Sequence, residues 1–114
     1  MKSSVSTITI FEMEHKLNND THMHPHLYQL QVTFQGVIGA HTGNIINKDI
    51  RDALINQVFD KYDGAKLHAD NFYGLNPTVE NLANEIFKFI REKSNQIYAI
   101  KLWESQEVFA EVGY

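Results

Sequence analysis

The 114-residue sequence contains no cysteine. This absence excludes disulfide bonds and any mechanism that uses a thiolate nucleophile. The sequence also lacks an excess of positive charge, because 10 lysine and arginine residues stand against 14 aspartate and glutamate residues, for a net charge of −4. We therefore expect no nucleic-acid partner, since non-specific nucleic-acid binding relies on clustered positive charge.

Long apolar runs are absent as well. The N-terminal residues lead directly into alternating threonine and isoleucine without the apolar core of a signal peptide, and no stretch approaches a membrane span. We therefore expect a cytoplasmic protein with no membrane partner. The apolar share of 43% is ordinary for a folded chain, and the length predicts one domain over residues 1–114.

Hydrophobic periodicity predicts four strands and two helices. The clearest strand alternates apolar and polar residues from His24 to Phe34, and the clearest helix carries an apolar stripe from Leu82 to Ile90. Residues 65–75 look irregular. The order ββααββ indicates an α+β fold in which a four-stranded antiparallel sheet has both helices on one face. The predicted strands are 6–15, 24–34, 97–104 and 108–114, and the predicted helices are about 49–62 and 77–93.

Histidine is the residue that stands out, with six in the chain and three of them between positions 22 and 26. His24 and His26 lie at positions i and i+2 of a predicted strand, so their side chains share one face about 6.5–7 Å apart along the strand. His15 ends the preceding strand, and a short loop separates it from His24. If these strands pair, three imidazoles can converge on one ion and leave a fourth position open, as in a catalytic zinc site.

A structural interpretation competes with this one, because a His-x-His pair on its own is a weak signal and histidines in loops are often plain surface residues. His22 also falls on the even register of the strand. Spacing alone therefore leaves open which histidines would bind a metal.

Five blocks of the sequence occur in an order that resembles the 6-pyruvoyltetrahydropterin synthase / 6-carboxytetrahydropterin synthase family, over nearly the whole chain. The blocks are Phe11-Glu12-x-x-His15-Lys16-Leu17, His24-Pro25-His26-Leu27-Tyr28, His41-Thr42-Gly43, Asn76-Pro77-Thr78-x-Glu80-Asn81-Leu82-Ala83 and Leu102-Trp103-Glu104-Ser105.

The resemblance implies a tunnelling fold, in which subunits join their sheets into a barrel. It implies a homohexamer of two stacked trimers with active sites at subunit interfaces. It also implies Zn²⁺ held by His15, His24 and His26, and a pterin anchored by the Glu104 carboxylate, with Thr78 helping to line the pocket. The alternative for Glu104 is a carboxylate at a strand end that reaches solvent, and the alternative for Thr78 is a helix cap.

The sequence departs from the family where protons are transferred. Members of the family carry a catalytic cysteine four residues before the first histidine of the His-x-His block, and this chain has Asp20 there. A variant branch uses a glutamate one residue later, where this chain has Thr21. The family's Asp-His pair is replaced by a stretch that contains His68 and Asp70. Asp20 is therefore the first candidate for the catalytic base, and His68 with Asp70 is the second. All three are also explained as ordinary loop residues.

Three functions are compatible with these patterns. The first is a zinc-dependent lyase acting on 7,8-dihydroneopterin triphosphate or a related pterin, by triphosphate elimination or side-chain cleavage, in folate or queuosine-type biosynthesis. The second is a non-catalytic homologue that binds a pterin or purine-like ligand. The third is a cupin-like metal protein, which the helical stripe from Leu82 to Ile90 argues against, because cupins are all-β.

Overall fold

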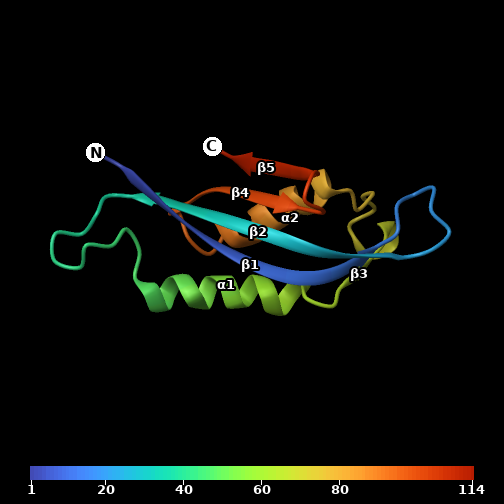
Figure 1. The fold of residues 1–114 in the computed structure, drawn as a ribbon, viewed down its shortest axis with the longest axis horizontal. Coiled ribbons are helices and arrows are strands. Elements are labelled where there is room, and N and C mark those ends of the chain that lie inside the picture. The colour runs from blue at the N-terminus through green and yellow to red at the C-terminus, as the bar shows by residue number, and fades with distance from the viewer.

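The computed structural model describes residues 1–114 as a single sheet with two helices packed against it (Figure 1). The sheet has five strands in the order β3-β1-β2-β4-β5. No helix is long and apolar enough to cross a bilayer. In chain order the elements are β1 (Ser3–His15), β2 (His24–Gly36), α1 (Lys48–Tyr62), β3 (Lys66–Leu67), a short 3₁₀ helix η1 (Ala69–Asn71), α2 (Val79–Arg91), β4 (Ile97–Trp103) and β5 (Phe109–Gly113).

The four predicted strands and their antiparallel pairing are confirmed, but the predicted strand count is wrong. The fifth strand, β3, has only two residues and runs parallel to the end of β1, where it pairs with Glu14 and His15. Backbone hydrogen bonds from Glu14 N to Ala65 O and from Lys16 N to Leu67 O hold it in place. A two-residue strand is too short to show periodicity, so residues 65–75 looked irregular in the sequence.

Both predicted helices are present, with small shifts at their ends. Helix α1 ends before Asp63 and Gly64, as predicted, and Gly64 has a φ of +79°, which favours glycine. Helix α2 begins at Val79 instead of 77, because the Thr78 side chain accepts a hydrogen bond from the N–H of Asn81 and so takes the N-cap position. The N-cap interpretation of Thr78 is therefore confirmed.

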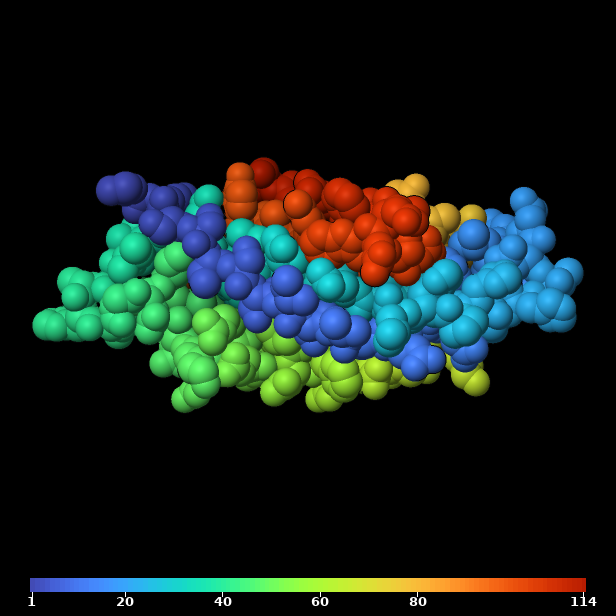
Figure 2. All heavy atoms as spheres, viewed as in Figure 1, coloured from blue at the N-terminus to red at the C-terminus, as the bar shows by residue number.

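One face of the sheet forms the core together with the helices. The alternating residues Tyr28, Leu30, Val32 and Phe34 of β2 are fully buried there, as their register predicted. The apolar stripe of α2 covers β4 and β5, and α1 lies along β1. The opposite face of the sheet is not covered by the helices of this chain, as Figure 2 shows, and its exposed apolar side chains are Ile8, Ile10, Leu27 and Phe109.

The core predicts a clear difference between two aliphatic substitutions. Leu82→Ala should lower the free energy of unfolding by about 2–5 kcal/mol, because Leu82 is fully buried and its truncation leaves a cavity. Ile50→Ala, at an exposed position of α1, should change it by less than about 0.5 kcal/mol. Denaturant unfolding of both variants measures the difference, and an equal loss in the two would contradict this description of the core.

Candidate metal centre

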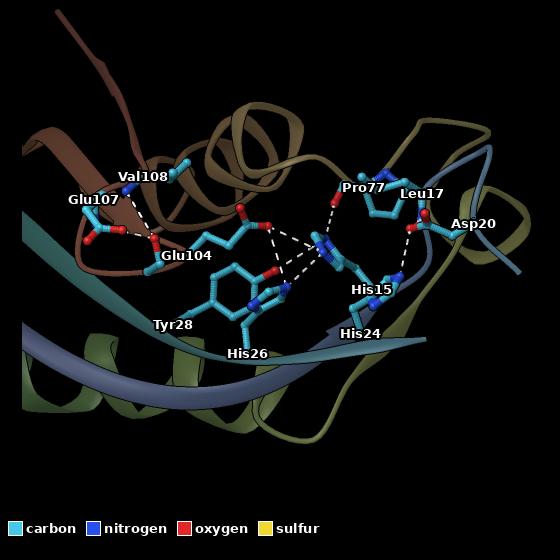
Figure 3. A network of polar contacts seen from close by, with 11 residues as sticks. His15, Leu17, Asp20, His24, His26, Tyr28, Pro77, Glu104, Glu107 and Val108 are labelled. Carbon is cyan, nitrogen blue, oxygen red and sulfur yellow. Dashed lines mark hydrogen bonds and ion pairs between the residues drawn. The ribbon is translucent and has the colours of Figure 1, made fainter. Parts of the chain in front are cut away.

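Two paired strands bring the predicted histidines to one end of the sheet. His15 is the last residue of β1 and lies opposite His24, the first residue of β2, while His26 lies opposite Met13. Glu104 follows directly after β4, which pairs with the other edge of β2. The register of three neighbouring strands therefore places one carboxylate and the histidine pair side by side (Figure 3).

Three of these side chains converge closely enough to hold a metal ion. The Nε2 atoms of His15 and His26 lie 3.2 Å apart, and Glu104 Oε1 lies 3.3 Å from His15 Nε2 and 3.9 Å from His26 Nε2. One ligand atom from each residue lies within 4.8 Å of the others. Two imidazole nitrogens and one carboxylate oxygen are ligands that suit a divalent ion such as zinc.

The orientation of His15 is set by its second ring nitrogen. His15 is 4% exposed, and its Nδ1 lies 2.8 Å from the backbone oxygen of Pro77 and 3.3 Å from the Tyr28 hydroxyl. A carbonyl oxygen can only accept, so Nδ1 carries the hydrogen and donates it to Pro77. In the neutral ring, Nε2 is then left with its lone pair directed at His26 and Glu104. A backbone acceptor behind a histidine ligand is a common feature of metal sites in proteins.

A tight turn after β4 positions Glu104. The Glu104 N–H donates to Val108 O, and Ser105 Oγ accepts hydrogen bonds from the N–H groups of Glu107 and Val108. This closed turn fixes the backbone from which the Glu104 side chain extends toward the histidines. The carboxylate is partly buried, so a cation bound between it and the imidazoles would offset part of the cost of removing it from water.

The environment favours the neutral forms of two groups at the centre. Burial lowers the pKa of His26, and the nearby His15 and His24 lower it further, while Glu104 acts in the opposite direction. Burial, followed by the charge of Glu104, raises the pKa of Tyr28 well above its ordinary value. His26 is therefore kept in the neutral form that can ligate a metal, and Tyr28 remains an uncharged hydroxyl.

His24, the third predicted ligand, lies outside the converging group. Its Nε2 lies 3.3 Å from Asp20 Oδ2, and no hydrogen bond or ion pair joins it to His26 or Glu104. Figure 3 shows His24 turned toward Asp20, on the side of His15 away from Glu104. His22 is exposed in the loop between the strands and makes no polar contact with the group.

The structure keeps the second pair of candidate catalytic residues apart from the centre. His68 Nδ1 lies 3.9 Å from Asp70 Oδ2, and the Asp70 side chain is 97% exposed. Neither residue has a polar contact with His15, His26 or Glu104. His68 and Asp70 line a pocket of about 360 Å³ together with Lys16, Leu17, Asn18, Met23 and Ala69.

Two contacts at the centre were not predicted from the sequence. The Tyr28 hydroxyl could have been found, because Tyr28 shares the even register of His24 and His26 on one face of β2. The carbonyl of Pro77 could not, because nothing in the local sequence indicates that the loop before α2 passes behind the end of β1. Asn76 supports that loop, since its side chain accepts from Asn18 N and its backbone oxygen accepts from Asn81 Nδ2.

Comparison with known proteins identifies the family. The family model described as 6-pyruvoyl tetrahydropterin synthase matches residues 4–113. The chain belongs to the 6-pyruvoyl tetrahydropterin synthase family. The resemblance found in the sequence is thereby confirmed.

Individual members of this family are similar to the chain to different degrees. The 6-pyruvoyl tetrahydrobiopterin synthase of Drosophila melanogaster is 31% identical over 93 residues, which are 76% of this chain and 55% of that protein. The chain thus spans about half the length of that relative.

Solved structures of the synthase family share the fold. The synthase of Caenorhabditis elegans superposes with a TM-score of 0.91 over 100% of this chain and 96% of that one, at 16% identity. A Plasmodium vivax synthase, in which a catalytic glutamate has been replaced by alanine, gives a TM-score of 0.77 over 98% and 97% of the two chains, at 14% identity. At such low identities the similarity establishes the tunnelling fold of the subunit.

The lowered pKa of His26 predicts a pH dependence for the metal-free protein. Once the pH falls below 6.5, the ordinary pKa of histidine, the unfolded chain binds more protons at His26 than the folded chain does. Above pH 6.5, His26 should therefore leave the free energy of unfolding unchanged. Below pH 6.5, the free energy of unfolding should decrease as the pH falls toward the lowered pKa of His26 in the folded state.

Denaturant unfolding in the presence of a chelator, between about pH 7.5 and 5.5, measures this effect. The variant His26→Gln should show a shallower loss of stability than the native chain. The control His41→Gln, which changes an exposed loop histidine, should follow the native curve. Identical slopes for the native chain and His26→Gln would contradict the prediction.

Proposed function

We propose that this chain is a zinc-dependent pterin-biosynthesis lyase that acts on 7,8-dihydroneopterin triphosphate or a closely related pterin, by triphosphate elimination or side-chain cleavage. The convergence of His15, His26 and Glu104 at one end of the sheet, in a member of the synthase family, is the observation that supports this proposal.

The metal would be held by His15 and His26 with a third ligand from either His24 or Glu104. When bound, zinc would supply a Lewis acid for the oxygens of the substrate side chain. The hydrogen bond from His15 Nδ1 to Pro77 O supports this assignment, because it leaves Nε2 free to ligate. The partly buried position of the group would also limit the water that competes with a substrate.

Glu104 is proposed as the pterin anchor, because a carboxylate can accept two hydrogen bonds from the amino-pyrimidinone edge of a pterin. The Oε1 atom of Glu104 faces the histidines in this structure. To anchor a pterin, the carboxylate would have to bind the pterin and the metal together, or turn away from the metal group. Thr78 would line the pocket while it caps α2, and it adjoins Pro77, whose carbonyl contacts His15.

Asp20 is proposed as the first candidate for proton transfer. The synthase of Plasmodium vivax has a catalytic glutamate, so a carboxylate can serve in this family. Asp20 lies 3.3 Å from His24 and is only 27% exposed, which places a carboxylate close to the histidines. His68, paired with the exposed Asp70, is the second candidate and lies in the neighbouring pocket.

Self-association into a homohexamer of two trimers is part of the proposal. Strand β3 pairs only with the last two residues of β1, so the rest of that edge has no partner strand within the chain, and β5 is free along its outer edge. Free edges favour pairing with another chain. Joining β5 of one subunit to β1 of the next would extend the sheet into a barrel, with the apolar side chains of the uncovered face inside it.

A turnover assay tests the enzymatic proposal. The zinc-loaded chain should convert 7,8-dihydroneopterin triphosphate or a related pterin, and a chelator should abolish conversion. Asp20→Ala should lower kcat at least about 100-fold if Asp20 transfers the proton, since a positioned acid or base contributes that much or more. His68→Ala should then have a small effect. Saturable pterin binding without turnover by the native chain would instead favour the non-catalytic homologue.

Sedimentation velocity tests the oligomer. We expect the purified protein to sediment with the mass of six chains, or of three where the two trimers separate on dilution. The reason is that each subunit has two free sheet edges. When the β5 edge of one subunit pairs with the β1 edge of the next, repeated pairing closes a ring. A single-chain mass across the whole concentration range would contradict the proposed barrel.

A further inference from the structure

The contact between Asp20 and His24 sets the position of the one predicted ligand that does not join the metal group. Asp20 Oδ2 lies 3.3 Å from His24 Nε2. The rings of His24 and His26 are both nearly perpendicular to that of His15. The centroid of His24 lies 6.4 Å from that of His15, whereas the centroid of His26 lies 4.8 Å from it. His24 therefore lies next to the group without being part of it.

The carboxylate that holds His24 is itself fixed by its loop. Asp20 Oδ2 accepts a hydrogen bond of 3.0 Å from the N–H of Leu17, and the N–H of Asp20 donates to Leu17 O. These two bonds close a turn between the end of β1 and the start of β2. The His24 side chain is 51% exposed and carries no other polar contact, so it is the less restrained of the two partners.

We propose that Asp20 is a positioning residue that retains His24 outside the metal group. Metal loading then transfers His24 from Asp20 to the ion, and the proton that His24 shared with Asp20 passes to solvent. This inference rests on the proposed metal centre. Loading would then have two linked results: His24 completes the ligand set with His15 and His26, and the Asp20 carboxylate is released beside the ion. Asp20 would thus lower the affinity of the protein for the metal. Its carboxylate would become available to a substrate only after the metal has bound.

The proposal and simple electrostatics predict opposite effects of removing Asp20. The loss of a negative charge near a cation site should weaken metal binding. Release of His24 should instead strengthen it, because the ion no longer competes with Asp20 for the imidazole. Because the contact between Asp20 and His24 is partly exposed, the gain in zinc affinity is limited to about fivefold.

A double-mutant cycle with zinc measures the effect. Zinc affinity is determined by competition with a chromophoric chelator for the native chain, Asp20→Ala, His24→Ala and the double variant. Asp20→Ala should bind zinc more tightly than the native chain, by up to about fivefold, and His24→Ala should bind it more weakly. In the His24→Ala background, Asp20→Ala should give no gain, because its effect acts through His24.

Two further variants keep the test decisive. Glu14→Gln removes a carboxylate one residue from His15 that pairs with Lys66, so it reports the effect of charge alone and should weaken binding slightly. Asp20→Ser provides a hydroxyl that can accept from Leu17 N but cannot reach His24. It should reproduce the tighter binding even if Asp20→Ala disturbs the loop.

The outcomes separate this inference from the proposed function. If the native chain binds zinc but Asp20→Ala and Asp20→Ser bind it no more tightly, or change affinity equally with and without His24, the positioning role of Asp20 is wrong and the metal centre stands. If the native chain binds no zinc, both are wrong.

Discussion

The hydrogen bond from His15 Nδ1 to the backbone oxygen of Pro77 is the constraint on which the site depends. It joins the end of β1 to the loop before α2, across 62 positions of sequence. It fixes the tautomer of a buried imidazole and so directs Nε2 at His26 and Glu104. The N-cap at Thr78 and the contacts of Asn76 hold the acceptor in place, so the start of α2 has a structural role in the metal group as well as in the core.

Much of the fold could be predicted from the sequence because its signals are local. The alternation of apolar and polar residues along β2 predicted both the strand and its buried face. The apolar stripe of α2 predicted the helix and its contact with the sheet. Strand β3 was missed because two residues show no period. For the site, the spacing of His24 and His26 predicted a shared face, and the pairing of the first two strands predicted the approach of His15. The side-chain directions of His24 and Glu104 depend on Asp20 and on the turn at Ser105, and spacing carries no information about them.

The proposed metal group and the candidate proton-transfer residues lie on different elements. His15 and His26 lie on long strands whose register is fixed by a buried face, and Glu104 directly follows β4, which pairs with β2. Asp20 lies in the loop before β2, and His68 and Asp70 lie at η1, where substitutions cost little packing. This division is compatible with the proposal that the metal group and the residues that transfer protons are separate parts of the site.

The central claim is that His15 and His26 hold one divalent ion at this end of the sheet. An anomalous difference map, collected at the zinc absorption edge from a crystal of the zinc-loaded protein, tests it most directly. We predict one strong peak per subunit within about 2.0–2.1 Å of the Nε2 atoms of both histidines. No peak between these two rings, or a peak bound only by other residues, would contradict the account.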